Sequence, residues 1–290
     1  MRLVTFRGEG GARLGVLRND DEVVEVAEPG DMLALIDAGD DGLRRVESAL
    51  TSSRGRSRKL ADVELLAPLP SPRGNVIAIG RNYQKHAAET ARIEGREPSP
   101  PTIFTKAITS LTEPYADIVI DPAISDKIDW EVELAVVVGK RGANIKRDAA
   151  RAHVFGYTVI NDVTARDIQS DWGGQYFKGK SLDRSSPLGP WIVTADEIAD
   201  PQALKLRLRL NGEVKQDSST ADMIYAVDEV LEWASKGMTL LPGTVIATGT
   251  PDGVGFARTP PEFLQPGDVM ESEVERIGVL RNRIVAAPRD

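Results

Sequence analysis

Three acidic residues stand at the ends of two apolar runs of the sequence. Glu131 and Glu133 precede the run at 134–138, and Asp162 follows the run at 155–160. Both runs are rich in β-branched residues and predict buried strands. Because side chains alternate along a strand, the two glutamates lie on one face, where they form either a solvated strand end or half of a charged site.

A shared cation would explain why acids end both runs. Three ionised carboxylates close together repel one another, so they converge only if a cation or protons neutralise them. The chain has no cysteine and two histidines, His86 and His153, which excludes a cysteine- or histidine-rich metal site. Oxygen ligands select hard ions such as Mg²⁺, Mn²⁺ or Ca²⁺. The sequence therefore makes an oxygen-only metal site plausible.

The composition limits the partners and the compartment. The 290 residues include 36 basic and 44 acidic ones, a formal net charge of −8, and no long basic run, which argues against binding to nucleic acid. The absence of cysteine fits a reducing compartment, and we expect the cytoplasm. The N-terminal segment lacks the apolar core of a signal peptide, and no stretch is apolar for the length of a membrane span, so no membrane partner is expected.

The first seventy residues predict a small α+β domain. It comprises strands at 3–6, 14–17 and 23–26 and a helix at 32–50. The polar, basic stretch at 51–59 is typical of a linker or an exposed loop. Pro68, Pro70 and Pro72 cluster soon after it, and we place a domain boundary near residue 70. The predicted domains are therefore 1–70 and 71–290.

The larger domain is predicted to be mainly β. Short β-rich runs occur at 76–79, 118–120, 134–138, 155–160, 204–210, 244–247 and 279–285. One helix interrupts them, because Met223, Val227, Val230, Leu231 and Ala234 recur at helical spacing before Gly237. The fold class is α+β, mainly β, without the regular alternation of a doubly wound nucleotide-binding fold.

A phosphate-binding pattern at 174–181 is misleading. Gly174 to Ser181 satisfies G-x-x-x-x-G-K-S, but a phosphate cradle needs a helix directly after it. Pro187, Gly189 and Pro190 leave no room for a helix of useful length. We therefore reject nucleotide binding and keep Lys180 as a catalytic or substrate-binding residue.

Five blocks of the sequence, taken in order, resemble the fumarylacetoacetate hydrolase family. They are Gly80-Arg81-Asn82-Tyr83 with His86, the strand Glu131-Val132-Glu133-Leu134, the segment 161–169 from Asn161-Asp162 to Gln169, Gly179-Lys180-Ser181, and Thr248-Gly249-Thr250-Pro251. The resemblance implies a mixed β-sandwich roll with a small variable N-terminal domain, usually as a homodimer. It makes Glu131, Glu133 and Asp162 the metal ligands. The longer members take a further upstream carboxylate ligand that has no clear equivalent here, so the chain is similar to the short type.

The resemblance also supplies a candidate base. His86 and Glu89 are three residues apart on a predicted helix and share a face, so the carboxylate can orient the imidazole. Simple solvation of both side chains is the alternative from the residues alone. The resemblance implies that they are the water-activating pair, with Lys180 stabilising an oxyanion. His153 has no such support and is interpreted as structural.

The charge of the predicted site calls for basic residues. Three carboxylates and a divalent ion sum to −1, which would repel an anionic substrate. Basic and neutral side chains in or beside the matched blocks are therefore predicted to bind substrate: Arg81, Tyr83, Lys106, Arg166, Gln169 and Thr250. We expect the contacts to the distal half of the substrate in a lid, which the helix bearing His86 would form, and in N-terminal loops.

The resemblance implies a metal-dependent enzyme acting on a small anionic keto acid. We expect Mg²⁺ or Mn²⁺, with Ca²⁺ as a substitute in a crystal, and hydrolysis of a C–C bond in a β-diketo acid of the acylpyruvate or diketo-deoxy sugar acid type. The alternatives within the family are an oxaloacetate-type decarboxylase and a hydroxymuconate-type isomerase. A non-catalytic metal- or sugar-acid-binding protein is the alternative from another class.

Overall fold

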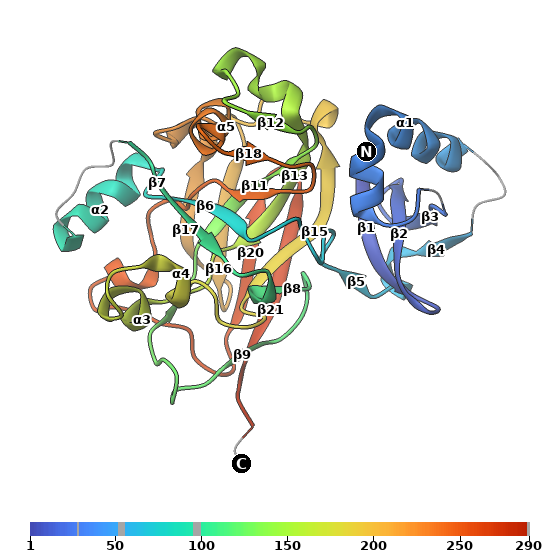
Figure 1. Ribbon diagram of the computed structural model, residues 1–290. Coiled ribbons are helices and arrows are strands. Elements are labelled where there is room, and N and C mark those ends of the chain that lie inside the picture. Colours follow the sequence, from blue (N-terminus) through green and yellow to red (C-terminus); the bar gives the residue numbers. More distant parts are fainter. Residues whose placement is uncertain (28, 52–55, 95–99, 289–290) are drawn as a thin grey trace.

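A computed structural model describes the chain except residues 28, 52–55, 95–99 and 289–290. A smaller N-terminal unit lies beside a larger β-rich body (Figure 1). Among the described residues, none of the helices combines the length and the apolar character needed to cross a bilayer. The mainly β fold that the sequence predicts is confirmed, with few helices outside the N-terminal unit.

The N-terminal unit is a small antiparallel sheet covered by one helix. It consists of β1 (Arg2–Gly8), β2 (Gly11–Arg18), β3 (Glu22–Glu25), α1 (Met32–Thr51), β4 (Ser57–Lys59) and β5 (Leu65–Leu66). The prediction of a linker or loop at 51–59 is wrong for its last three residues, because Ser57–Lys59 pairs with β3. Residues 52–55 of that stretch lie outside the described residues.

The sheet of this unit continues into the larger body. Leu3 of β1 pairs with Ile192 of β15 (Ser186–Thr194). From β15 the sheet runs through β13 (Val154–Asn161), β11 (Val132–Val138), β19 (Val245–Ala247), β6 (Val76–Gly80) and β7 (Thr102–Lys106), and β8 (Leu111–Thr112) also pairs with β15. The two units thus share one hydrogen-bonded sheet, and the boundary near residue 70 stays a prediction.

A second sheet packs on the larger body. Its order is β17 (Glu213–Ser219), β16 (Lys205–Leu210), β20 (Val269–Val274), β21 (Gly278–Ala286) and β9 (Ile118–Ile120). Leu134 and Val136 of β11 share a core with Leu206 and Leu280 of this second sheet. Ala135 and Val137, from the other face of β11, belong to the core that extends to the N-terminal unit. Burial on both faces explains the almost uninterrupted apolar run of β11.

Short elements complete the larger body. They are α2 (Gln84–Glu94), β10 (Ile128–Asp129), β12 (Gly142–Ala143), β14 (Thr164–Ala165), α3 (Arg166–Asp171), α4 (Tyr176–Gly179), α5 (Val227–Ser235) and β18 (Thr239–Leu240). The predicted helix at 223–234 is α5, but Met223 lies before its first turn, still buried in the core. The first helix or strand after the Gly174–Ser181 pattern is strand β15, whereas a phosphate cradle needs a helix at this place.

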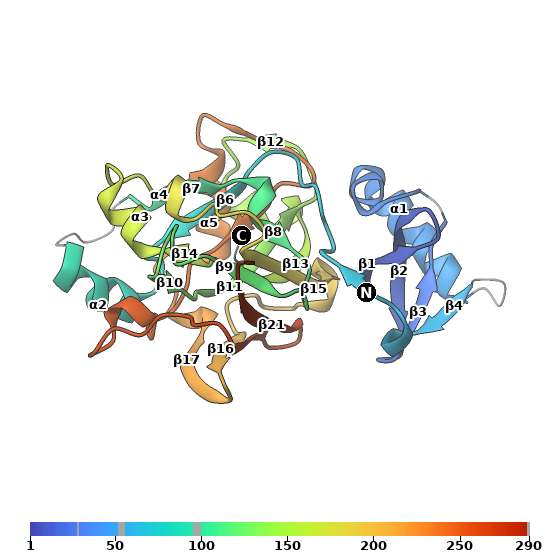
Figure 2. The same ribbon diagram turned by 90° about the horizontal axis from the view of Figure 1, so that it is seen from below.

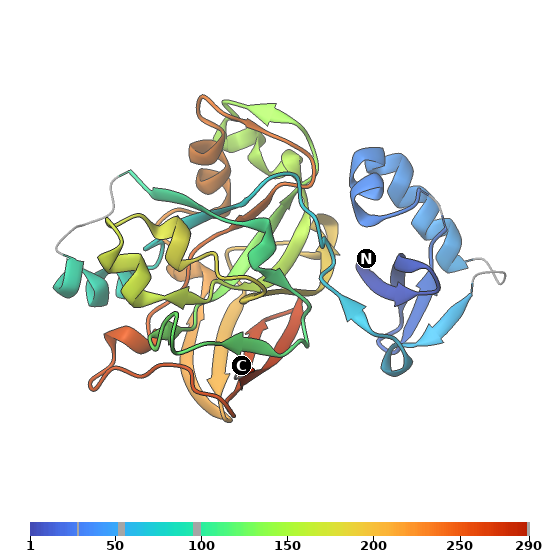
Figure 3. The same cartoon turned by 60° about the horizontal axis from the view of Figure 1, so that its bottom comes forward.

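The helices that surround the three acids lie far from the N-terminal unit. In two views, α2, α3 and α4 occupy one side of the larger body and β1–β4 the opposite side (Figures 1 and 2). The third view shows the same separation, with the sheet of the larger body between them (Figure 3). The fold therefore places the N-terminal loops away from the region of Glu131, Glu133 and Asp162.

Candidate active site

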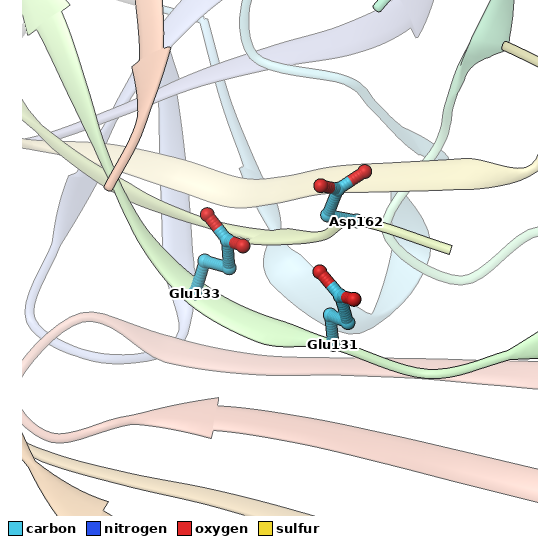
Figure 4. Close-up of side chains that lie close together, drawn as sticks. All are labelled: Glu131, Glu133 and Asp162. Carbon is cyan, nitrogen blue, oxygen red and sulfur yellow. The ribbon is translucent and has the colours of Figure 1, made fainter. Parts of the chain in front are cut away.

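The pairing of β11 with β13 brings the three acids together. The strands are antiparallel with Val132 opposite Asn161, so Glu131 lies beside Asp162, whose N–H donates to the Glu131 carbonyl oxygen at 2.8 Å. Glu133 is two residues further along the same face. All three side chains are buried, and one oxygen atom from each carboxylate lies within 4.8 Å of the other two. Figure 4 shows the three side chains close together.

Three buried cations contact two of the three carboxylates. Lys180 Nζ is 2.7 Å from Glu131 Oε2 and 2.7 Å from Asp162 Oδ2. Lys106 Nζ donates to Asp162 Oδ1 at 2.5 Å, and Arg166 Nη2 forms an ion pair with Glu131 Oε1 at 2.7 Å. Glu131 and Asp162 are therefore each held by two basic side chains.

Glu133 has a different environment from its neighbours. Its Oε2 accepts the Gly249 N–H at 2.7 Å, and within the described part of the chain no basic side chain forms an ion pair with it. Gly249 has φ +102°, and a Cβ there would lie 2.6 Å from Asn82 Cβ, so only glycine brings this N–H so close. Glu133 is the one member of the cluster whose charge is not balanced by a direct contact.

The pKa values of the two glutamates diverge for this reason. Burial alone would raise the pKa of Glu131, but the charges of Lys180 and Arg166 lower it to about 2. Burial and the charges of Asp162 and Glu131 raise the pKa of Glu133 well above its ordinary value. Burial would lower the pKa of Lys180, yet Asp162 and Glu131 raise it.

The donor set fits a divalent metal ion. Three buried carboxylates within reach of one ion offer only hard oxygen ligands, which suit Mg²⁺ or Mn²⁺. A cation beside Glu133 would also supply the positive charge that the protein does not place there. The cluster is therefore a candidate site for a divalent metal.

Helix α2 carries a histidine that lines the cavity of the acidic cluster and a glutamate that contacts this histidine. His86 Nδ1 lies 2.9 Å from Glu89 Oε1, and the second oxygen of Glu89 accepts the Gly253 N–H at 3.3 Å. Both carboxylate oxygens of Glu89 are thereby engaged, which fixes the imidazole. His86 lines the same cavity as Glu131 and Glu133. The predicted helix and its i, i+3 pair are present.

Arg166 is held from three sides. Its Nε donates to Asp129 Oδ2 at 2.8 Å, and its guanidinium lies 4.1 Å from the centre of the Phe256 ring. Asp129 is buried and also accepts the N–H groups of Gly255 and Phe256. Gln169 Oε1 accepts from Arg166 Nη1 at 3.1 Å. These contacts direct the guanidinium at Glu131 rather than at solvent.

The family model that matches most of the chain decides its membership. Residues 75–285 match the C-terminal domain of fumarylacetoacetate (FAA) hydrolase, and residues 1–68 match the Rv2993c-like N-terminal domain. The chain belongs to the fumarylacetoacetate hydrolase family. This confirms the resemblance and indicates that the protein is an enzyme.

Relatives of known name are similar over most of their length. The chain is 46% identical to oxaloacetate tautomerase YisK of Bacillus subtilis over 226 residues, 78% of this chain and 74% of that protein. It is 41% identical to the mitochondrial oxaloacetate tautomerase FAHD2A of Bos taurus over 296 residues, 98% and 92% of the two chains. The structure of maleylpyruvate hydrolase from Sphingobium sp. SYK-6, in complex with manganese(II) ion and pyruvate, has a TM-score of 0.82 at 29% identity and covers 99% of this chain and 100% of that one.

In this member of the fumarylacetoacetate hydrolase family, a small inner cavity of about 30 Å³ lies against Glu131 and Glu133. Several residues singled out in the sequence line it: Arg81, His86, Glu131, Glu133, Arg166, Gln169, Lys180 and Thr250. The hydroxyl of Thr250 donates to the Val132 carbonyl oxygen at 3.0 Å, so its hydrogen is already engaged. No described residue before Ile79 lines this cavity, which leaves the expected contribution of N-terminal loops without support.

Other predicted residues lie behind the cavity wall. Lys106 is completely buried against Asp162, and Asp162 and Glu89 support the site without lining the cavity. Tyr83 is also buried, and within the described structure its hydroxyl finds no hydrogen-bond partner. In this arrangement Lys106 and Tyr83 contact no open space, and their predicted role in substrate binding stays a prediction.

The sequence did not single out Asp129, Phe104, Tyr176 or Phe256. Asp129 is visible as the first acid of Asp129-Trp130-Glu131, but nothing in that spacing separates a partner of Arg166 from a solvated residue. The three aromatic residues line the inner cavity. They come from β7, α4 and the segment after β19, and only the fold brings them together.

Proposed function

We propose that this enzyme catalyses the enol–keto tautomerisation of a small 2-keto dicarboxylate of the oxaloacetate type. Two relatives that cover three quarters or more of this chain are named oxaloacetate tautomerases. Their names favour the non-hydrolytic branch over the C–C hydrolysis expected from the sequence. The structural relative named as a hydrolase keeps C–C hydrolysis as the competing reaction at this site.

The observation that carries the proposal is the His86–Glu89 pair beside the acidic cluster. Conversion of an enol to its keto form removes a proton from the enol oxygen and adds one to the carbon next to the carbonyl carbon. His86 lines the cavity and has Nδ1 engaged by Glu89, so Nε2 can exchange a proton with a molecule in the cavity. No water has to attack in this reaction.

Glu131, Glu133 and Asp162 would hold Mg²⁺ or Mn²⁺ beside the substrate. When bound, the ion supplies positive charge that stabilises the negative charge developing as the proton leaves. The manganese(II) ion in the hydrolase relative supports a metal of this class for the present chain. Either ion, Mg²⁺ or Mn²⁺, fits the proposal.

The buried charges suit a dianionic substrate once a divalent ion is present. Asp129, Glu131, Glu133 and Asp162 face Lys106, Arg166 and Lys180, which leaves a net charge of −1. A divalent ion changes it to +1. Arg166 and Lys180 also line the cavity and can bind carboxylate oxygens there.

The test follows the disappearance of enol-oxaloacetate by its ultraviolet absorbance. We expect the enzyme to accelerate this disappearance in the presence of Mg²⁺ or Mn²⁺ and to lose that acceleration in a chelator. His86→Gln should lower the rate by about 10² to 10⁴-fold, the usual contribution of a general acid–base, and should keep the rise in Tm caused by metal. His153→Gln is the matched control, because His153 lies outside the cavity and bonds to the Lys140 carbonyl oxygen.

The reaction products distinguish the proposed tautomerase from a decarboxylase and from a hydrolase. Release of CO₂ and pyruvate from oxaloacetate faster than tautomerisation would identify a decarboxylase. Cleavage of an acylpyruvate without any effect on the enol would identify a hydrolase. A wild-type enzyme that leaves enol-oxaloacetate decaying at the uncatalysed rate with both metals contradicts the proposal. The homodimer implied by the family is also a proposal, and sedimentation velocity tests it.

A further inference from the structure

A buried glutamine of the second sheet binds both segments that build the site. Gln216 of β17 is 1% exposed, and its Oε1 accepts the Val132 N–H at 3.1 Å, between the two glutamates of the acidic cluster. Its Nε2 donates to Thr250 Oγ1 at 2.9 Å and to the Pro251 carbonyl oxygen at 2.8 Å. The Val132 N–H can only donate and the Pro251 oxygen can only accept, so these partners fix the orientation of the amide. Gln216 therefore links β11 to the segment 250–253.

The segment 250–253 lies directly on the backbone of β17. Gly253 has φ +95°, and a Cβ there would be 2.1 Å from the Lys215 carbonyl oxygen. Only glycine combines this conformation with so close an approach. The hydroxyl of Thr250 donates to a carbonyl oxygen of β11 and accepts from Gln216, so it is held from two strands. Gln216 and Gly253 together keep the segment in place.

The other end of this segment contacts the His86–Glu89 pair. The Gly253 N–H donates to Glu89 Oε2 at 3.3 Å, and Glu89 Oε1 lies 2.9 Å from His86 Nδ1. Gln216 is therefore connected to the imidazole through Gly253 and Glu89. Neither Gln216 nor Gly253 lines the inner cavity, so neither touches a molecule bound there.

The acidic cluster has other supports. Strand β11 pairs with β13 along its whole length, and the Glu131 N–H donates to Asn161 Oδ1 at 2.9 Å. Glu131 and Asp162 are also each held by two buried cations. These contacts do not involve Gln216. The orientation of the base therefore depends on Gln216 more than the position of the acids does.

We propose that Gln216 is a positioning residue of this enzyme, which orients Glu89 and the imidazole of His86 by fixing the segment 250–253. Without its amide, the segment loses two of the hydrogen bonds that hold it on β17, and Gly253 no longer presents its N–H to Glu89 at a fixed place. This inference rests on the proposed function for what His86 does to the substrate, whereas the orientation of the imidazole rests on the hydrogen bonds alone.

Replacing Gln216 by methionine tests this role in the kinetics. Gln216→Met keeps the length of the side chain and removes its hydrogen bonds. The kcat for enol-oxaloacetate should fall by about 10 to 10²-fold, since a displacement of about 1 Å can cost a factor of 10². The rise in Tm caused by Mn²⁺ should remain. Loss of this rise would assign Gln216 to the acids instead of the base and would overturn the proposal.

Asn282→Leu is the matched control for the loss of a buried amide. Asn282 of β21 is completely buried in the same sheet and donates to the carbonyl oxygens of Pro114 and Ala116 at 3.3 and 2.9 Å. It does not line the inner cavity. Both substitutions should lower the free energy of unfolding measured in urea, but only Gln216→Met should lower kcat. Equal losses of kcat in the two variants contradict a specific role of Gln216.

The two histidines of the chain report the orientation without any turnover. In both, Nδ1 lies 2.9 Å from an oxygen acceptor, Glu89 Oε1 for His86 and the Lys140 carbonyl oxygen for His153. This favours the tautomer with its proton on Nδ1. In Gln216→Met labelled with ¹⁵N-histidine, the ring nitrogen shifts of His86 should move toward a mixture of tautomers, while those of His153 stay unchanged. Unchanged shifts of His86 overturn the proposal. If the wild type does not accelerate tautomerisation, the proposed function fails, and these shifts still decide the positioning role.

Gly253→Ala tests the same link from the other side. The added Cβ must push the segment away from β17, so this variant should lower kcat and change the His86 nitrogen shifts as Gln216→Met does. Gly212→Ala is the matched control, because Gly212 has φ +82° and no atom within 4 Å of an added Cβ. It introduces similar backbone strain and should keep the wild-type kcat. A wild-type kcat in Gly253→Ala, with folding verified by circular dichroism, contradicts the proposal.

Discussion

Replacing Glu133 by glutamine in the metal-free protein tests the electrostatics of the acidic cluster. At the 4.8 Å limit, one pair of like charges costs about 3.5 kcal/mol at an effective dielectric constant of about 20. Glu133 has two such neighbours, Glu131 and Asp162. Keeping its carboxyl protonated at pH 7 costs about 3.4 kcal/mol, since its ordinary pKa is 4.5 and each unit corresponds to about 1.36 kcal/mol. Keeping Glu133 protonated therefore costs less than the repulsion from two ionised neighbours. Glutamine removes only this smaller cost, so it should stabilise the folded state by about 3 kcal/mol at most.

The raised pKa of Glu133 makes the stability of the wild type depend on pH. The unfolded chain releases the Glu133 proton near pH 4.5, while the raised pKa keeps it bound in the folded state. The wild type consequently loses stability as the pH rises above 4.5. Glutamine cannot ionise, so Glu133→Gln should match the wild type near pH 4.5 and exceed its Tm by roughly 5 to 10 °C at pH 7. Thermal melts in a chelator across this range measure the difference.

Glu131→Gln is the matched control with the opposite sign. Lys180 and Arg166 outweigh burial and lower the pKa of Glu131 to about 2, so its charge stabilises the folded state above the unfolded pKa. That contribution is lost as the pH falls through about 2. At pH 7 the substitution should destabilise by about 3 kcal/mol. Both variants should lose the stabilisation that Mn²⁺ gives the wild type, a free energy of about 2.7 kcal/mol at a hundred times the Kd, which is seen as a rise in Tm. If Glu133→Gln destabilises the metal-free protein as much as Glu131→Gln, the reasoning is refuted.

Three further predictions concern the charges around the cluster. Lys106→Met leaves Asp162 with one buried cation fewer and should lower the free energy of unfolding by about 3 to 5 kcal/mol, measured by urea denaturation; a change under 1 kcal/mol would contradict the ion pair. Asp129→Asn weakens the hold on Arg166 and should raise KM for oxaloacetate more than it lowers kcat, while equal losses in both would point to general misfolding. Oxalate, a dianion, should bind more tightly with Mg²⁺ present and should tighten Mg²⁺ binding by the same factor, about tenfold or more in calorimetry, since coupling between two ligands is reciprocal; independent binding would contradict the charge balance.

The positions of the acids at the ends of two strands were accessible from the sequence because they depend on local patterns, whereas their convergence was implied only by the family resemblance. Residues 131–138 and 155–162 carry the alternation and apolar content of two central strands, and their acids stand at opposite ends of those runs. Antiparallel pairing of neighbouring strands then places Glu131 beside Asp162. The spacing of His86 and Glu89 on α2 is likewise local. These features follow from periodicity, which a single sequence displays.

Contacts between segments that are distant in the sequence could not be predicted from local periodicity. Strand β1 pairs with β15, nearly two hundred residues later, and no local pattern selects that partner. The same holds for Phe104 and Tyr176, whose rings meet only because α4 packs on β7. Lys106 is predicted from the sequence to bind substrate, but its strand places it behind Asp162. Tertiary placement decides all three.

Glu131 and Glu133 show how far the environment separates two identical side chains on one strand. Glu131 directly precedes β11, Glu133 lies in it, and both are buried, so neither residue type nor burial distinguishes them. The difference comes from the segments that reach each carboxylate: Lys180 and Arg166 reach Glu131, whereas the backbone of Gly249 reaches Glu133. A glycine N–H carries no net charge, so the repulsion among the acids remains concentrated at Glu133. A divalent ion bound by these acids would relieve the most repulsion beside Glu133, because Lys180, Lys106 and Arg166 already neutralise the charges of Glu131 and Asp162.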